Sequence, residues 1–316
     1  MSNLPPEASF VPLEAVNRYR QRQHNGPAVH SSLEPDDGLL EATAWHGKTV
    51  PARKWIVDGM IPRDEVTMIT GNGGEGKSLL TMQLLVAATA GGAWLGKEVP
   101  NVRVLGVYCE DDEDELHRRT NGILDGDRRS FADCDGLTLV CRKGLNSVMY
   151  EAGFNDMQGQ TTEFFNRLKL TAQQLGAEII VLDSLYNFFA GNENNRAHAN
   201  QFVNALCDIA KATGGAVVLV SHPSLSGMGS GSGTAGNTAW HNAVRSRLYL
   251  HRKKHPSGDP EEIGPLVLED MKQNYGPKNG SIEVRYDNGR FVDVGPQIDT
   301  PPFDNSKFQK EFGETL

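Results

Sequence analysis

The segment GNGGEGKS, residues 71–78, constrains this chain more than any other stretch of its sequence. It fits the pattern G-x-x-x-x-G-K-[ST] and stands between EVTMIT, which is rich in strand-forming residues, and LLTMQLLVAATA, an apolar run of helical length. Glycines let the backbone turn back, so that several N–H groups point into one concavity at a positively polarised helix N-terminus. The order of strand, glycine loop and helix therefore predicts a phosphate-binding P-loop and disfavours an ordinary surface turn.

A P-loop assigns a task to each of its side chains. Lys77 is expected to reach the β- and γ-phosphates, and the hydroxyl of Ser78 is expected to bind Mg²⁺. The predicted cofactors are therefore ATP and Mg²⁺. The residues predicted to bind the nucleotide are Gly71, Asn72, Gly73, Gly74, Glu75, Gly76, Lys77, Ser78 and Leu79.

The segments that follow the P-loop alternate between strands and helices. Beyond the first strand and helix, strands are expected within residues 102–111, 137–142, 177–185 and 216–224, and helices within 112–124, 162–176 and 198–215. Buried apolar strands separated by helices predict an α/β fold with a mostly parallel sheet, which binds ligands at the C-terminal ends of its strands. From Leu248 onward, short strands with Gly, Pro and Asn turns predict an antiparallel extension at the sheet edge.

The two ends of the chain differ in composition from the middle. Residues 1–50 form a polar arm that is either mobile or docks a partner, residues 51–295 form the predicted ATPase domain, and residues 296–316 form a tail that is either disordered or docks a neighbour. No apolar run has the length of a membrane span and the N-terminus lacks a signal-peptide pattern, so we expect a cytoplasmic protein without membrane contact. A net charge of -9 provides no global attraction to nucleic acid, although a local basic loop could still bind it.

Three polar side chains follow the predicted core strands. Asp183 ends IIVLD, where a carboxylate can hold Mg²⁺ beside Ser78. Glu110 stands at the end of the predicted strand within residues 102–111 and is a candidate general base for the attacking water. The acids after it are expected to form a solvated helix N-terminus. His222 ends a third strand, where its imidazole could hydrogen-bond the γ-phosphate; the alternative is a histidine that merely caps the strand.

Two features after His222 suggest action beyond a single nucleotide site. The loop PSLSGMGSGSGTAGNTAW is either functional or a passive linker, and loops this long are usually functional or disordered. Arg245 and Arg247 lie two residues apart, so in a strand both would point to one face. Such a pair could stabilise a transferring phosphoryl group in a neighbouring subunit; the alternative is surface charge.

These motifs together resemble the RecA-like ATPases, and most closely the RepA-type hexameric replicative helicases of plasmids and phages. The resemblance rests on GNGGEGKS, YCEDDEDELHRR, IIVLDSL, VLVSHPS and MKQNYGP in that order, between residues 55 and 294. It implies a RecA-like P-loop core. It also implies a role for each of five side chains. Glu110 would be the catalytic base, Asp183 the magnesium ligand and His222 the γ-phosphate sensor. Arg245, with Arg247 as the second candidate, would be the arginine finger that acts from the next protomer.

The resemblance further implies a ring, expected to be hexameric, around single-stranded DNA, with possible replication partners. The loops facing DNA would be residues 191–200 and 224–240. Because the second loop contains almost no Lys or Arg, the N–H groups of its glycines, together with Arg196, would have to meet the phosphates. Fold does not fix function, so a filament, a loader or a regulatory scaffold that does not unwind DNA remains an alternative.

Overall fold

The computed structural model describes residue 38 and residues 40–153, 156–222, 238–253, 264–276 and 280–295. The chain divides into two compact units, Met1–Ala52 and Arg53–Leu316. In the first unit the described part contains one short 3₁₀ helix, η2 (Ala42–Trp45), which buries none of its side chains. Most of the N-terminal arm and all of the C-terminal tail that the sequence predicts lie outside the described residues.

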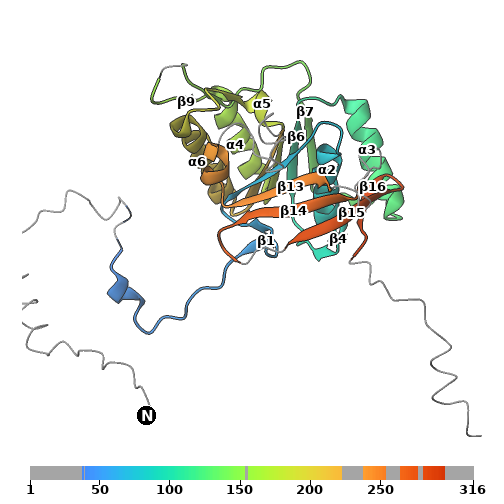
Figure 1. Cartoon of the computed structure of the whole chain (residues 1–316), viewed down its shortest axis with the longest axis horizontal. Coiled ribbons are helices and arrows are strands. Elements are labelled where there is room, and N and C mark those ends of the chain that lie inside the picture. The colour runs from blue at the N-terminus through green and yellow to red at the C-terminus, as the bar shows by residue number, and fades with distance from the viewer. Residues whose placement is uncertain are drawn as a thin grey trace, which may run out of the picture. The chain divides into compact units, whose positions relative to one another are not determined.

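The second unit is built on a nine-stranded sheet with the order β16-β15-β14-β13-β3-β12-β10-β6-β7 (Figure 1). Six adjacent strands are parallel: β3 (Val66–Gly71), β6 (Val104–Tyr108), β7 (Leu137–Cys141), β10 (Ile179–Asp183), β12 (Ala216–Ser221) and β13 (Ser246–Arg252). Three further strands continue the sheet in antiparallel fashion: β14 (Leu266–Gln273), β15 (Ser281–Asp287) and β16 (Arg290–Asp293). The predicted α/β fold with a mostly parallel sheet and an antiparallel extension is confirmed.

Helices cover both faces of the sheet and enclose two separate apolar cores. One core contains buried residues of α2 (Lys77–Ala90) and α3 (Glu113–Gly126), and the other contains those of α4 (Glu163–Leu175) and α6 (Arg196–Thr213). Successive side chains of a strand alternate between the two cores: Val181 of β10 joins the first, while its neighbour Leu182 joins the second. The sheet therefore holds its strand ends between two packed layers.

Local capping explains where the helices begin and end. Asp112 caps α3 by accepting a hydrogen bond from the backbone N–H of Glu115 at 2.9 Å, and Asn195 caps α6 in the same way. Gly176 and Gly214 end α4 and α6 in the left-handed conformation, which a glycine adopts without strain. These signals stand in the sequence, and the predicted helices accordingly lie close to the observed ones.

Strand β13 corrects one expectation from the sequence. It pairs in parallel with β3, with Leu250 opposite Gly71, so it belongs to the parallel part of the sheet. Only β14, β15 and β16 form the antiparallel extension. Turn residues around β13 resemble those of a β-meander, but five of its seven side chains are buried, as expected for an interior strand.

Several short elements were not predicted. They are β1 (Trp55–Val57), β2 (Ile61–Pro62), β4 (Ala93–Trp94), β5 (Lys97–Glu98), β8 (Tyr150–Glu151), β9 (Gln160–Thr161), β11 (Phe189–Ala190), η3 (Phe131–Asp133), α5 (Leu185–Phe188) and α8 (Thr238–Ala243). Within the described ranges, none of the helices combines the length and the apolar character that crossing a bilayer requires.

Candidate active site

The functional side chains predicted at strand ends come together at one edge of the sheet. Strands β3, β12, β10 and β6 are neighbours, and their C-terminal ends lie side by side, with Asp183 in register with Tyr108. An open cavity of about 1060 Å³ lies at this edge. Its lining includes nine of the predicted site residues: Gly74, Glu75, Gly76, Lys77, Ser78, Leu79, Glu110, Asp183 and His222.

The loop 71–76 has the backbone shape that its glycines allow. Gly74 and Gly76 adopt φ angles of +79° and +92°, which L-residues rarely adopt. Gly71 is required for a different reason, because a Cβ there would lie 2.6 Å from the carbonyl oxygen of Leu250 in β13. Gly71, Asn72 and Gly73 do not line the cavity themselves.

Lys77 lies folded against its own loop. Its side chain is 5% exposed, and its Nζ donates to the carbonyl oxygens of Gly71 at 2.7 Å and Asn72 at 2.8 Å. Nζ also lies 3.3 Å from Nδ1 of His222. Burial lowers the pKa of Lys77, and Asp183, Glu110 and Glu75 act in the opposite direction. A phosphate group in the cavity would compete with the two carbonyls for this ammonium.

Asp183 and Ser78 fit a magnesium ion. The Asp183 carboxylate is 5% exposed, burial raises its pKa to about 6, and its hydrogen bond to Ser78 acts against that rise. Among the described residues, its Oδ2 has no hydrogen-bond partner. A buried carboxylate oxygen with free acceptor capacity beside a hydroxyl suits Mg²⁺, which usually takes one or two protein carboxylates and keeps its remaining ligands from water and phosphate. The described part of the chain contains no cluster of three His, Cys, Asp or Glu side chains that could hold a metal ion.

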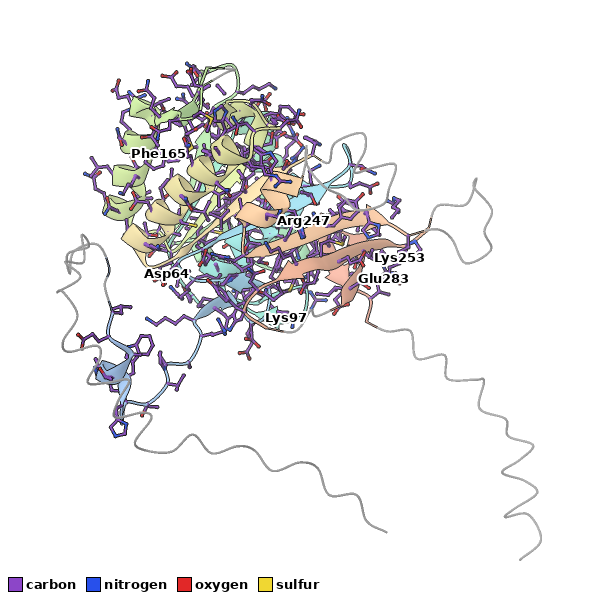
Figure 2. All side chains as sticks on the ribbon, turned by 60° about the vertical axis from the view of Figure 1, so that its left-hand side comes forward. Asp64, Lys97, Phe165, Arg247, Lys253 and Glu283 are labelled. Carbon is purple, nitrogen blue, oxygen red and sulfur yellow. The ribbon has the colours of Figure 1, made fainter. Side chains whose placement is uncertain are left out.

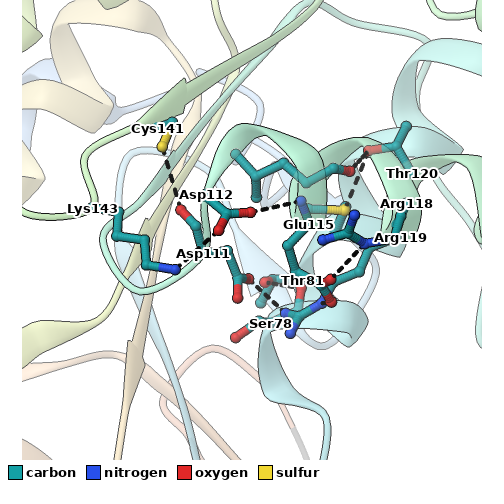
Figure 3. A network of polar contacts seen from close by, with 12 residues as sticks. Ser78, Thr81, Asp111, Asp112, Glu115, Arg118, Arg119, Thr120, Cys141 and Lys143 are labelled. Atoms are coloured by element: carbon teal, nitrogen blue, oxygen red, sulfur yellow. Dashed lines mark hydrogen bonds and ion pairs between the residues drawn. The ribbon is translucent and has the colours of Figure 1, made fainter.

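Glu110 lies apart from the acidic network that follows it. Its Oε1 accepts a hydrogen bond from Ser184 Oγ at 3.1 Å, which places the carboxylate next to the end of β10. The acids that follow form ion pairs with nearby cations (Figure 3). Arg119 of α3 pairs with Asp111 at 2.6 Å and with Glu115 at 2.8 Å, and Lys143, which follows β7, pairs with Asp112 at 3.0 Å. The role of Glu110 as a general base stays a prediction.

The two arginines proposed to act in a neighbouring subunit have different surroundings. Arg245 precedes β13 and is exposed, whereas Arg247 lies inside the strand (Figure 2) and is 1% exposed. Nη1 of Arg247 lies 3.0 Å from Nδ1 of His241. Neither lines the cavity of its own chain. The same-face prediction required both residues to lie in one strand, and β13 begins at Ser246, one residue after Arg245. Their exposure favours Arg245 over Arg247 for a role toward another protomer.

The two loops expected to face DNA are described unequally. Residues 191–195 form a loop, whose Asn192 N–H donates to Nδ1 of buried His198 at 3.2 Å. Arg196 is exposed but begins α6, so the second half of this predicted loop is helical. Residues 223–237 lie outside the described residues. Trp240, predicted as the end of that loop, is a buried residue of α8.

The sequence did not identify the C-terminal wall of the cavity. Nε of Arg252, at the end of β13, lies 3.4 Å from the Glu75 carboxylate, and the Phe291 ring of β16 packs on Gly76. Further wall residues come from β15 and the segments around it: Glu283, Val284, Arg285, Tyr286, Gly289 and Val294. No local motif marks these residues, since they reach the P-loop only through the pairing of distant strands.

The sheet order, the P-loop and the carboxylates at the strand ends define a RecA-like P-loop ATPase. Residues 31–228, more than half of the chain, match the family described as AAA domain, and the chain belongs to this family. The solved structure of the KaiC-like protein PH0186 from the hyperthermophilic archaeon Pyrococcus horikoshii OT3 is similar in fold, with a TM-score of 0.50. The sequence identity is 11%, and the match covers 78% of this chain and 98% of that chain.

Proposed function

We propose that this ATPase is a DNA helicase or translocase of the RepA type, which acts as a hexameric ring on single-stranded DNA in the replication of a plasmid, phage or other mobile element. The observation that carries the proposal is the contact between Lys77 and His222. It joins the P-loop lysine to the residue directly before the Gly/Ser-rich segment 223–237. A change at the γ-phosphate would thereby reach the segment that we assign to DNA contact.

The site residues suit in-line hydrolysis of ATP. Glu110 would take a proton from a water molecule whose oxygen attacks the γ-phosphorus, while the bond to the β–γ bridging oxygen breaks to give ADP and inorganic phosphate. Lys77 would offset the charge on the phosphates, and His222 would donate to a γ-phosphate oxygen. Magnesium held by Ser78 and Asp183 supplies further charge neutralisation when it is bound.

A cluster of cations supports a contribution from the neighbouring protomer. Arg247 stands opposite Lys272 across β13 and β14, and Arg245 lies close by. Burial and then the charges of Arg245 and Arg247 lower the pKa of Lys272. Lys272 donates to the carbonyl oxygens of His241 and Asn242, and Arg247 is buried beside His241, so Arg245 is the exposed cation of this cluster. Because Arg245 also lies outside the cavity of its own chain, we assign it as the finger to the phosphates of an adjacent copy.

Arginine action in trans can be tested with mixed assemblies. Arg245→Ala should lower ATP turnover by about 10³-fold, as loss of an arginine finger does. Mixing this variant with Lys77→Ala protein should restore part of the activity, because some interfaces then combine an intact P-loop with an intact finger. If co-assembled mixtures show no recovery at all, Arg245 does not act across the interface.

The helicase assignment is tested by three measurements on the full chain. We expect ATP hydrolysis stimulated by single-stranded DNA, displacement of a strand from a forked duplex, and rings in particle images with an ATP analogue and an oligonucleotide. DNA-stimulated hydrolysis with filaments and no strand displacement would instead support the filament or loader. Hydrolysis that ignores DNA would support the regulatory scaffold. The Lys77→Ala variant is the control for hydrolysis by contaminants.

A further inference from the structure

A side chain from the C-terminal end of the fold packs directly on the P-loop. The Phe291 ring of β16 is 5% exposed, and a Cβ placed on Gly76 would lie 2.6 Å from its Cζ. Gly76 precedes Lys77 and is the N-cap of α2. The ring therefore touches the backbone position where the loop turns into the helix whose first N–H groups face the phosphates.

The backbone of Phe291 is fixed to the same helix by a single side chain. Gln83 of α2 is buried; its Nε2 donates to the Phe291 carbonyl at 2.8 Å, and its Oε1 accepts from the Phe291 N–H at 2.9 Å. A primary amide can satisfy both backbone groups of one residue in this way, as a neighbouring strand would. Gln83 follows Gly76 by two helical turns and lies on the same side of α2. It does not line the nucleotide cavity.

The turn of the β15–β16 hairpin is attached to α3. Gly289, with a φ of +87°, lies so close to α3 that an added Cβ would meet the Gly122 carbonyl oxygen at 2.3 Å. A Cβ on Gly126 would lie 2.7 Å from the carbonyl oxygen of Asn288, and Arg290 pairs with Asp127 directly after the helix. The hairpin thus spans both helices of this face, one beginning at the P-loop and the other shortly after Glu110.

We propose that Phe291 and Gln83 are positioning residues of the ATP site: the C-terminal hairpin holds Gly76 and the first turn of α2 in the shape that receives the phosphates. The proposal rests on the ATP-binding part of the proposed function and does not depend on DNA unwinding. Neither residue is assigned to the reacting atoms. A preorganised loop avoids an ordering cost when the ligand binds, so its loss should weaken ATP binding and leave the chemical step in place.

Gln83→Met is the decisive variant, because it keeps the size of the side chain and removes both hydrogen bonds without touching the cavity. We expect the Kd for a non-hydrolysable ATP analogue and the KM for ATP to rise about tenfold, because the loop must then be ordered when the ligand binds, with kcat within about twofold of wild type. Phe291→Ala should raise Kd and KM at least as much. Phe291→Leu, which keeps an apolar contact with Gly76, should recover part of the affinity.

Val292→Ala is the matched control, since Val292 follows Phe291 in β16 and does not line the nucleotide cavity. It should lower the melting temperature and preserve the upward shift in Tm that the ATP analogue causes, whereas Gln83→Met should reduce that shift. If folded Gln83→Met protein binds the analogue like wild type, or loses kcat at unchanged KM, the proposal is overturned. Should Phe291→Ala fail to fold, Gln83→Met and Phe291→Leu still decide. Wild-type protein in the same assay separates this result from a failure of ATP binding itself.

Discussion

The parallel half of the sheet and its antiparallel extension contribute different things to the same cavity. The parallel half supplies charged and titratable groups, each within two residues of a strand end or at the start of α2 directly after the P-loop: Lys77, Glu110, Asp183 and His222. The antiparallel strands contribute the Phe291 ring that packs on Gly76, and they also bring Glu283 and Arg285 to the cavity wall. The comparison teaches that the chemistry of this site is local in the sequence, while the support of the site is distant.

This division has a kinetic consequence. Substitutions among the strand-end groups should reduce turnover, because these groups act on the charges that develop in the transition state. Substitutions in the C-terminal wall should mainly reduce nucleotide affinity. The four variants below test that separation, in order of decreasing expected effect.

Lys77→Ala should abolish ATP hydrolysis while the protein remains folded. We expect the buried ammonium to stabilise phosphate charge in the reaction, and its own desolvation means that it contributes little to the stability of the fold. Phosphate release measured with ATP and Mg²⁺ checks turnover, and circular dichroism checks folding. Lys97→Ala, a change in β5 far along the chain from the P-loop, is the control (Figure 2). Turnover near the wild-type rate would rule out the P-loop assignment.

Glu110→Gln should bind ATP normally and hydrolyse it about 10²- to 10⁴-fold more slowly, since the amide keeps the size of the side chain but cannot accept the proton. Analogue binding and single-turnover hydrolysis separate the two effects. Glu113→Gln, in the exposed first turn of α3, is the matched control. If both the affinity for ATP and the turnover collapse, Glu110 is a structural residue. The proposal that groups of the parallel half act on turnover alone would then be wrong for Glu110.

The difference between local and distant contributions also explains how much of the fold and of the site could be predicted from the sequence. The P-loop, Asp183 and Glu110 were predicted because each follows an apolar strand with a helix behind it, and parallel strands bring such positions to one edge. Capping residues such as Asp112 set helix boundaries through bonds to residues three positions away. These signals need only a short window of sequence.

What the sequence could not supply depends on pairings between distant segments. The same-face rule for Arg245 and Arg247 requires both residues in one strand, and the start of β13 at Ser246 is decided by its partners β3 and β14. The contacts of Phe291 likewise arise only once the hairpin lies on α2. Gly122 and Gly126 lie four residues apart in α3, although the predicted helix ended before Gly126, and they leave room for close approach of another backbone, which the hairpin turn occupies.

Arg252→Gln tests the C-terminal wall by removing a charge, whereas the Phe291 variants change its packing. Arg252 stands next to Glu75, and together they place a cation and an anion beside the phosphate-binding loop. Removing the cation leaves Glu75 to repel phosphate, so we expect the Kd for ATP to rise about three- to fivefold, as suits a half-exposed pair, with kcat little changed. Titration with a fluorescent ATP analogue measures this. Arg167→Gln, which breaks the exposed pair with Glu163 on α4, is the control. A fall in kcat instead would mean that this wall of the cavity also takes part in the chemistry.

The smallest expected effect is a pH dependence of the stability of the fold, which comes from His222 in the parallel half. Burial, and then the charge of Lys77, hold the pKa of His222 below its ordinary value, while Glu110 acts in the opposite direction. The unfolded chain therefore binds the proton more readily than the folded one. Stability associated with the neutral imidazole is present above the unfolded pKa of about 6.5 and is lost as the pH falls through that value toward the folded pKa.

Wild-type protein should accordingly lose stability relative to His222→Gln between pH 7.5 and pH 5.5, without nucleotide. Urea unfolding at several pH values measures this as a change in the difference between the two midpoints, on the order of a few tenths of a molar. The raised pKa of Asp183, about 6, changes stability in the opposite direction, but it is common to both proteins and cancels in their difference. An ATP analogue should diminish the effect, because phosphate oxygens near the imidazole favour its protonated form. A difference that stays constant with pH would show that Lys77 and burial do not set the protonation of His222, and would weaken its proposed link between the γ-phosphate and the loop after β12.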